Sequence, residues 1–284
     1  MAQTARSRPD RCPGVVHPWP ADDGGLVRIR IPGGRVPLTA LRALATVAQE
    51  YGDGRVRLTG RANLQLRAMP LDADGRLAAP ALAALERTGL LPSRAHDRIR
   101  NVLASPQTGL AGGRADLRPV VTTLDALLRA DDEMARLPGR FLFTLDDGRG
   151  DLADRHKDLG LVALDAATAQ LVVGDGYGDV VALDAAPAAL VALARAFLAA
   201  RGTGPDAAWH VPELAAPLVR PADPVPGATI STGPLPFGPV AGGEHVAVGE
   251  DGLDLAALSP WTAPAVVVTP WNGVLIPSTS EEAP

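Results

Sequence analysis

The stretch from Val56 to Met69 reads VRLTGRANLQLRAM and consists of two short runs in which apolar and polar residues alternate. The runs meet at Thr59 and Gly60, a pair that favours a tight turn, so the stretch predicts strand, turn and strand. Because alternate side chains of a strand point to opposite faces, one face is apolar and the other is polar. The polar positions are Arg57, Arg61, Asn63, Gln65 and Arg67.

Such a row of guanidinium and carboxamide groups has two interpretations. It suits a ligand with several carboxylates, because arginine presents a planar fork of donors that matches a carboxylate. It is also what the solvated outer face of any half-buried strand shows. The spacing alone does not separate the two.

A degenerate copy of the stretch lies near the C-terminus, from Val266 to Pro277. Aligning Thr59 with Thr269 places Leu64 over Val274, and an apolar segment followed by a helix-like segment precedes both copies. The copies are too far apart for a solenoid. The sequence therefore predicts two matching halves of one pseudo-symmetric body, with other residues inserted between them.

At these residues the chain resembles the nitrite and sulfite reductase family, whose ferredoxin-like half-domains carry a Thr-x-Arg-x-x-x-Gln strand pair. Here the pattern is Thr59, Arg61 and Gln65. The chain is similar to the precorrin-3B synthase branch of that family at residues 11–14 (RCPG) and 269–271 (TPW). The resemblance implies an α+β fold in which two ferredoxin-like half-repeats flank a sirohaem-reductase-type α/β middle domain.

The order of elements predicts the domain boundaries. A strand over 26–31, a helix over 37–51, the strand pair and a helix over 77–88 give half of a ferredoxin-like sheet. We therefore expect a first half-repeat over 1–90, a middle α/β tetrapyrrole-binding domain over 91–204, a proline-rich linker over 205–239 and a second, shortened half-repeat over 240–284. Within the middle domain, helices are predicted over 121–135 and 187–201, a buried strand over 141–145, and a three-strand meander over 159–183.

Two segments of the middle domain resemble family motifs. Arg100-Asn101-Val102 resembles an Arg-Asn-Val motif whose arginine lines the anion site, although a solvated loop explains the same arginine-rich segment. The segment from Leu137 to Phe143 resembles a strand with two lysines that face the substrate, and Arg140 occupies the first lysine position. Leu142 occupies the second, which argues against sulfite or nitrite as substrate, because a small oxyanion needs several converging cations.

The resemblance thus implies a carboxylate-binding set, whereas no catalytic residue is identified. The set is Arg61, Asn63, Gln65, Arg100, Asn101 and Arg140. The five histidines are scattered without metal-ligand spacing, so no metal site is predicted. The aspartate-rich loop over 146–154 is interpreted as a surface turn, with a divalent-metal loop as the alternative.

Composition limits the remaining possibilities. A net charge of -5 does not favour a general nucleic-acid binder, and neither a signal peptide nor a membrane span is apparent, so a cytoplasmic protein is expected. Cys12 is the single cysteine, which excludes an intramolecular disulfide and a [4Fe–4S] cluster held by four cysteines of this chain. In the family, a cysteine-rich C-terminal segment normally holds that cluster and the axial ligand of sirohaem, and we expect this chain to lack it.

Three functions remain open. The first is a precorrin-3B synthase-like oxidoreductase of cobalamin biosynthesis, in which O₂ and reducing equivalents serve to hydroxylate a polycarboxylate tetrapyrrole. A sirohaem-like tetrapyrrole cofactor and a redox partner chain are then implied. The second is a non-catalytic tetrapyrrole-binding protein that has lost the redox centre, and the third is a sirohaem-type nitrite or sulfite reductase fragment.

Overall fold

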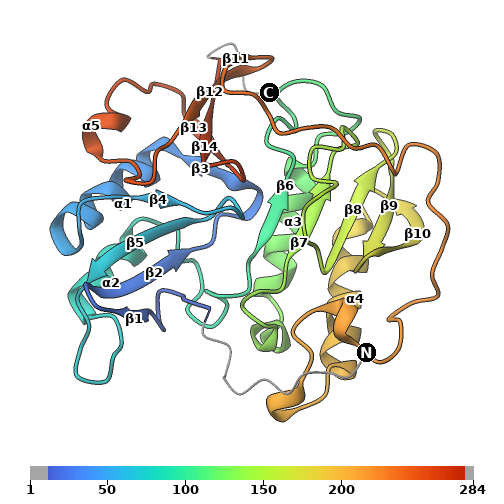
Figure 1. Ribbon diagram of the computed structural model, residues 1–284, viewed down its shortest axis with the longest axis horizontal. Coiled ribbons are helices and arrows are strands. Elements are labelled where there is room, and N and C mark those ends of the chain that lie inside the picture. Colours follow the sequence, from blue (N-terminus) through green and yellow to red (C-terminus); the bar gives the residue numbers. More distant parts are fainter. Residues whose placement is uncertain (1–11, 279–284) are drawn as a thin grey trace. The chain divides into compact units, whose positions relative to one another are not determined.

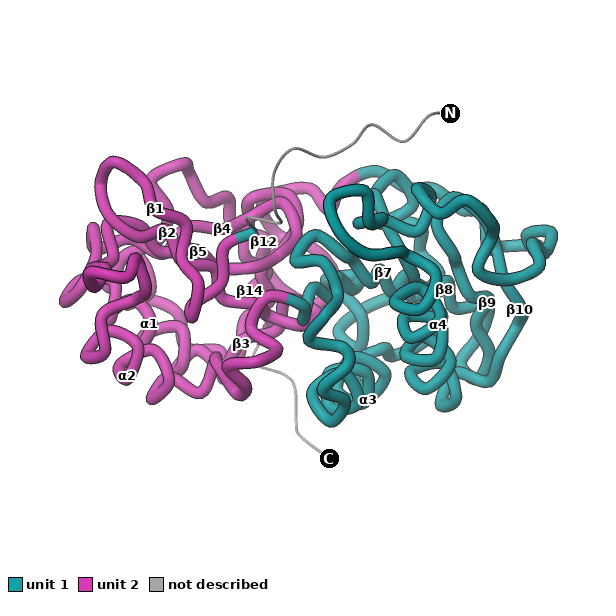
Figure 2. The backbone as a smooth tube through the Cα atoms, turned by 90° about the horizontal axis from the view of Figure 1, so that it is seen from below, with its two compact units in different colours: residues 1–12, 99–233 teal, residues 13–98, 234–284 magenta. Residues whose placement is uncertain are grey.

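The computed structural model describes residues 12–278, which form two compact units (Figure 2). Of the described residues, unit 1 comprises Cys12 and residues 99–233, and unit 2 comprises residues 13–98 and 234–278. Unit 2 is therefore interrupted in sequence by unit 1. The stretch 205–239, expected to be a linker, divides at Gly233 between the two units.

Unit 2 begins with a four-stranded antiparallel sheet in the order β1-β2-β5-β4 (Figure 1). Its elements are β1 (Trp19–Ala21), β2 (Gly24–Ile29), α1 (Leu38–Tyr51), β4 (Arg57–Leu58), β5 (Leu64–Met69) and α2 (Ala79–Arg87). As the 3.6-residue period predicts, α1 buries Leu41, Leu44, Ala45 and Ala48 on one side. The predicted strand–helix–strand–strand–helix order is thus present, and β1 is an additional strand that precedes the predicted elements.

The C-terminal part of unit 2 repeats this arrangement. Its elements are β11 (Gly238–Val240), β12 (Gly243–Ala247), α5 (Leu255–Leu258), β13 (Ala265–Thr269) and β14 (Gly273–Pro277). They form a sheet in the order β11-β12-β14-β13, which matches the order of the first sheet strand by strand. A short strand of the first copy, β3 (Arg35–Pro37), follows the 3-10 turn η1 (Pro32–Gly34) and pairs with the outer edge of β13.

The turns of the two hairpins confirm the alignment of Thr59 with Thr269. In both copies the residue three positions after the threonine has a positive φ, 54° at Ala62 and 56° at Asn272. The cross-strand pairs also correspond, because Leu58 lies opposite Leu64 and Val268 lies opposite Val274. The pseudo-repeat predicted from sequence therefore holds in strand order, polarity and register.

Unit 1 is a five-stranded mixed sheet in the order β10-β9-β8-β7-β6. Its elements are β6 (Val102–Ala104), α3 (Arg118–Arg129), η2 (Asp132–Arg136), β7 (Phe143–Asp146), β8 (Leu159–Ala163), β9 (Thr168–Val173), β10 (Gly176–Ala182), α4 (Ala186–Ala200), η3 (Gly204–Asp206) and η4 (Val211–Glu213). Strands β6, β7 and β8 are parallel, and β8, β9 and β10 form the predicted antiparallel meander. Helices α3 and α4 pack together beside this sheet (Figure 1).

An aromatic cluster lies in the core of unit 1. The ring of Phe141 lies 5.4 Å from that of Phe143 and 4.8 Å from that of Phe197 on α4, measured between centroids. All three side chains are fully buried, so each contributes roughly 3–5 kcal/mol relative to alanine. The buried strand predicted over 141–145 is present, although its regular hydrogen bonding begins only at Phe143.

Backbone groups of residues 205–233 form hydrogen bonds with the rest of unit 1, so these residues are not a free linker. The buried Gln170 donates from Nε2 to the carbonyl of Asp223 at 2.9 Å, and its Oε1 accepts from the amide of Val225 at 2.9 Å. The amide of Thr232 donates to the carbonyl of Gly150 at 2.9 Å. Proline composition alone does not reveal these partners.

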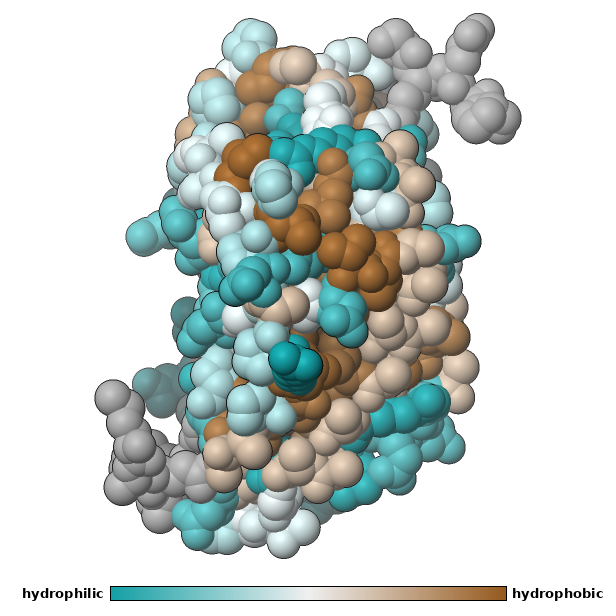
Figure 3. Space-filling view, turned by 90° about the vertical axis from the view of Figure 1, so that its right-hand side faces the viewer, coloured by the Kyte–Doolittle hydropathy of each residue, from teal (hydrophilic) through white to brown (hydrophobic). Residues whose placement is uncertain are grey.

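On the face shown in Figure 3, hydrophobic side chains form a band that hydrophilic residues interrupt. Among the described residues of unit 1, the large hydrophobic side chains that are exposed are Val180 and Ile230. No helix within residues 12–278 has the length and apolar character needed to cross a bilayer.

Candidate functional site

A row of basic and amide side chains runs across three strands of the first copy in unit 2. Gln65 on β5 lies opposite Arg28 of β2 on one side and opposite Arg57 of β4 on the other. Arg28 donates from Nη2 to Gln65 Oε1 at 3.0 Å, and all three side chains are half-buried. The sequence pattern predicted Arg57 and Gln65 on this face, and β2 adds Arg28, which the alternation around Thr59 does not include.

Arg61 lies in the turn at the end of this row, where it is half-buried next to the left-handed residue Ala62. Two other arginines of the same face are paired within unit 2. Arg57 forms an ion pair with Asp53 at 2.6 Å, and Arg67 forms one with Asp23 at 3.0 Å. We call Arg28, Arg57, Arg61 and Gln65 the basic row.

Asn63 does not belong to the basic row, contrary to the sequence-based expectation. Its side chain is buried, and Oδ1 accepts a hydrogen bond from the amide of Ile31 at 2.9 Å. The amide of Asn63 donates to Thr59 Oγ1 at 3.1 Å. Strict alternation fails here because the turn residues 59–63 do not follow the two-residue period of a strand.

Replacing Asn63 with alanine is therefore expected to reduce stability. The change leaves the buried amide of Ile31 without its acceptor, which costs about 1–3 kcal/mol. Urea unfolding measures the loss, and the exposed helical residue Gln49, changed to alanine, serves as a control that stays within about 0.5 kcal/mol of wild type. A variant Asn63→Ala as stable as wild type would contradict this structural assignment.

The second copy carries different side chains at the positions of the basic row. By strand register and turn position, Arg28, Arg57, Arg61 and Gln65 correspond to His245, Val267, Trp271 and Leu275. Val267 and Leu275 are buried, and burial lowers the pKa of His245, which favours its neutral form. The same hairpin therefore folds with mostly apolar residues at these positions, so the fold does not itself require the charges.

In unit 1 the structure places Arg100 in a buried ion pair. Its Nε donates to Asp125 Oδ1 and its Nη2 donates to Asp125 Oδ2 at 3.1 Å, while the side chain of Arg100 is 7% exposed. The neighbouring Asn101 is buried and donates from Nδ2 to the carbonyl of Gly139 at 2.9 Å. Arg100 is therefore buried rather than part of a solvated loop, both residues make contacts within unit 1, and their carboxylate-binding role stays a prediction.

Arg94, Arg114 and Arg118, which also lie within residues 91–120, are engaged within their own units as well. Arg94 pairs with Glu86 at 2.6 Å, and Arg118 pairs with Asp116 at 2.8 Å. Arg114 donates to the carbonyls of Ala163 and Gly227 at 3.2 and 3.1 Å. Arginine density in this loop thus reflects local structure. Arg140, which occupies the first lysine position of the resembled strand, is exposed and precedes β7.

The aspartate-rich loop after β7 is buried rather than a surface turn. Asp146 accepts from the amides of Gly148 and Gly150 at 2.9 Å each, so it does cap the turn as expected. Burial raises the pKa of Asp146. Burial and repulsion by Asp146 raise the pKa of Asp151 to about 7, although the hydrogen bond that Asp151 accepts from Ser105 at 2.7 Å acts to lower it. Within the loop, Arg149 forms an ion pair with Asp147, with 2.7 Å between Nη2 and Oδ2.

Asp146 also borders a small cavity of about 130 Å³ beneath residues 228–230. Lys157 and Tyr177 line the same cavity, and burial lowers the pKa of Lys157. The space suits a few water molecules rather than a tetrapyrrole.

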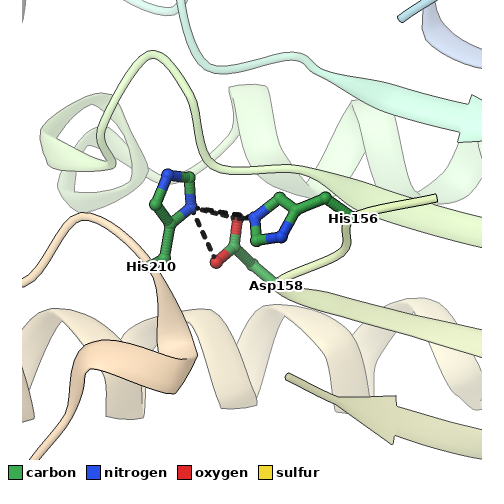
Figure 4. Close-up of side chains that lie close together, drawn as sticks. All are labelled: His156, Asp158 and His210. Atoms are coloured by element: carbon green, nitrogen blue, oxygen red, sulfur yellow. Dashed lines mark hydrogen bonds and ion pairs between the residues drawn. The ribbon is translucent and has the colours of Figure 1, made fainter. Parts of the chain in front are cut away.

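The structure also gathers a cluster that spacing did not suggest. His156, Asp158 and His210 lie together in unit 1, although His210 is 54 residues from His156 in sequence (Figure 4). No local pattern reveals this, because the two segments meet only in the folded sheet.

An iron–sulfur cluster does not fit the residues of this chain. A [4Fe–4S] cluster held by one protein requires four thiolates, and the sequence has only Cys12, which is buried. The absence of an intrinsic cluster stays a prediction that iron and acid-labile sulfide assays can check.

The fold and the basic row together define an α+β protein with two ferredoxin-like half-repeats that flank a mixed-sheet unit in sequence. Residues 20–78 match the profile of the nitrite/sulfite reductase ferredoxin-like half domain, and this stretch contains β2, α1, the hairpin and the whole basic row. The family resemblance inferred from Thr59, Arg61 and Gln65 is thereby confirmed.

Three curated proteins illustrate the similarity. A precorrin-3B synthase from a Sinorhizobium species is 30% identical over 148 residues, which cover 51% of this chain and 30% of that protein. The ferredoxin–nitrite reductase of Synechococcus elongatus is 34% identical over 131 residues, 44% of this chain and 25% of that protein. The corresponding enzyme of Leptolyngbya laminosa is 30% identical over 148 residues, 50% of this chain and 28% of that protein. Each match therefore spans less than a third of the relative.

Among solved structures, the Mycobacterium tuberculosis NirA protein has the same fold. It matches with a TM-score of 0.65 at 18% sequence identity, covering 89% of this chain and 54% of that chain. The similarity extends over both units, so the predicted α+β architecture is confirmed beyond the first half-repeat.

Proposed function

We propose that this chain is a precorrin-3B synthase-like oxidoreductase of cobalamin biosynthesis that binds a polycarboxylate tetrapyrrole. The similarity to a precorrin-3B synthase supports the class of reaction, and the basic row supports the class of ligand. A redox partner chain would supply electrons, as the names of the ferredoxin–nitrite reductases suggest for those relatives. Since this chain has one cysteine, the redox centre would be provided by that partner or by a bound cofactor.

One observation carries the proposal. The basic row of the first copy has mostly apolar counterparts in the second, although both hairpins share strand order, register and turn conformation. Because the second copy folds without these arginines, binding of a negatively charged ligand is the simplest explanation for their presence in the first copy. Half-buried arginines are suited to this task, because partial removal from water strengthens a charge-assisted hydrogen bond.

Within this proposal the residues of the basic row bind and orient the ligand. Arg61 and Arg28 would each hold a peripheral carboxylate through paired N–H donors. Gln65, already an acceptor for Arg28 at 3.0 Å, fixes that guanidinium and offers its own amide donors. Arg140 is exposed in unit 1, and its carboxylate-binding role stays a prediction, whereas Arg100 and Asn101 make contacts within that unit.

Binding is tested with uroporphyrin, a polycarboxylate tetrapyrrole. Loss of one charge-assisted contact costs about 1.5–3 kcal/mol, so Arg61→Ala is expected to weaken binding roughly tenfold to a hundredfold. Gln65→Leu introduces the residue that the second copy has and should weaken binding while leaving the thermal melt unchanged. The matched control is Arg87→Ala, which removes an exposed arginine of α2 in the same unit. Equal affinities for wild type and both row variants would refute the assignment.

The second candidate is a non-catalytic tetrapyrrole-binding protein, and the single cysteine favours it. Both candidates predict binding, so the two are separated by turnover. Tetrapyrrole-dependent O₂ consumption in the presence of an electron donor is expected of the oxidoreductase and not of the binding protein. Nitrite or sulfite reduction is less favoured, because Leu142 replaces a lysine and is buried.

A further inference from the structure

We propose that His156, Asp158 and His210 form a binding site for a divalent transition metal of the zinc class in unit 1 (Figure 4). His156 and Asp158 lie immediately before β8, and His210 lies immediately before η4. Two imidazoles and one carboxylate are a donor set that zinc accepts in proteins.

The distances between the three donor atoms fit a single small cation. His156 Nε2 lies 3.1 Å from His210 Nδ1, His210 Nδ1 lies 3.2 Å from Asp158 Oδ2, and His156 Nε2 lies 3.8 Å from Asp158 Oδ2. Zinc bonds of roughly 2.0–2.2 Å at tetrahedral angles place neighbouring ligand atoms about 3.3–3.6 Å apart. The observed triangle therefore needs shifts of only a few tenths of an ångström to hold the ion.

Hydrogen bonding alone accounts poorly for this arrangement. His210 Nδ1 faces His156 Nε2 and both oxygens of Asp158, at 3.1, 3.2 and 3.2 Å. If His210 Nδ1 carries the proton, both oxygens of Asp158 and His156 Nε2 share that one hydrogen; if His156 Nε2 carries it, His210 Nδ1 faces the carboxylate without a hydrogen between them. A metal ion instead uses one lone pair from each of the three groups.

The carboxylate is held in place as a metal ligand should be. Asp158 is fully buried, Oδ1 accepts from the amide of Val211 at 2.9 Å, and Oδ2 accepts from the amide of Leu142 at 2.9 Å. Each oxygen keeps a second lone pair for a metal. Such outer contacts orient a ligand and are a common feature of protein metal sites.

The site is open on one side. The side chain of Asp158 is 0% exposed, that of His210 is 19% exposed and that of His156 is 47% exposed. An ion can therefore enter from solvent next to His156, and water would complete a four-coordinate site. Bound metal would join the start of β8 to the segment that follows α4, so it would stabilise unit 1.

The test uses the full chain without a polyhistidine tag, first treated with a chelator and then titrated with Zn²⁺ by calorimetry. One equivalent is expected to bind and to raise Tm by several degrees. His156→Ala and His210→Ala should each weaken binding at least about tenfold, whereas His17→Ala, which removes an exposed histidine of unit 2, should not. The visible spectrum of the Co²⁺ form should show the intense bands of four-coordinate cobalt and lose them in both variants.

Three outcomes would overturn the proposal. They are the lack of stoichiometric Zn²⁺ binding by wild type, equal binding by wild type and both histidine variants, or an octahedral Co²⁺ spectrum that the variants share. Because His156 is largely exposed, His156→Ala is expected to fold normally, and its far-ultraviolet circular dichroism checks this. Loss of binding can thus be separated from loss of structure.

Discussion

Arg100→Ala is expected to destabilise unit 1 by roughly 3 kcal/mol, at the lower end of the cost of breaking a buried ion pair. The change removes two hydrogen bonds from Asp125, whose side chain is only 14% exposed. The cost is not larger because Asp125 keeps a contact with Arg129 Nε at 3.1 Å. Urea unfolding followed by circular dichroism measures the shift in midpoint.

Arg118→Ala is the control for this effect. Arg118 pairs with Asp116 in a largely exposed position, so its removal should change stability by less than about 1 kcal/mol. If Arg100→Ala unfolds like wild type but binds uroporphyrin more weakly, Arg100 serves the ligand and the structural assignment is wrong. Loss of stability with unchanged affinity supports it.

Asp151→Asn is expected to make the protein more stable than wild type at pH 8, with a smaller difference at pH 5. The pKa of Asp151 is raised from 3.8 to about 7 in the folded protein, so the folded state holds its proton more tightly than the unfolded state. Wild-type stability therefore falls as pH rises from about 4 to 7, and the asparagine variant lacks this loss. Between pH 5 and 8 the difference should grow by roughly 2–3 kcal/mol.

Asparagine suits this test because its amide oxygen can still accept the hydrogen bond that Ser105 gives to Asp151 at 2.7 Å. Thermal or urea unfolding at several pH values supplies the measurement. Asp154→Asn, at an exposed position of the same loop, should show no such growth. A stability difference that is constant from pH 5 to pH 8 would mean that Asp151 titrates alike in the folded and unfolded states.

The sequence predicted the parts of the fold that depend on local pattern. The alternation around Thr59 gave the hairpin, and the alignment with Thr269 gave the repeat down to the left-handed residues Ala62 and Asn272. Helices such as α1 and α4 followed from their apolar period. Each of these features depends on the pattern within a short stretch of sequence, or on the match between two such stretches. The amino-acid sequence alone is therefore enough to predict them.

The site was less predictable, because its contacts join distant residues. Arg100 and Arg61 have the same side chain, but Arg100 is buried in an ion pair with Asp125. Nothing near Arg100 in the sequence indicates this partner. Asn63 fits the alternating pattern but turns inward to Ile31. The partners His156 and His210 meet only because the segment after α4 returns to the start of β8. Composition and spacing carry no record of such tertiary contacts.

The pairing of β3 with β13 has a consequence for synthesis on the ribosome. Strand β3 leaves the first copy and completes the sheet of the second, which is made only after all of unit 1. Residues 99–233 are contiguous, so unit 1 is able to fold as it emerges, while the N-terminal part of unit 2 waits with an unpaired strand edge. Cotranslational folding would thus proceed from the inserted unit outward, and β3 would lack its partner strand until β13 has been made.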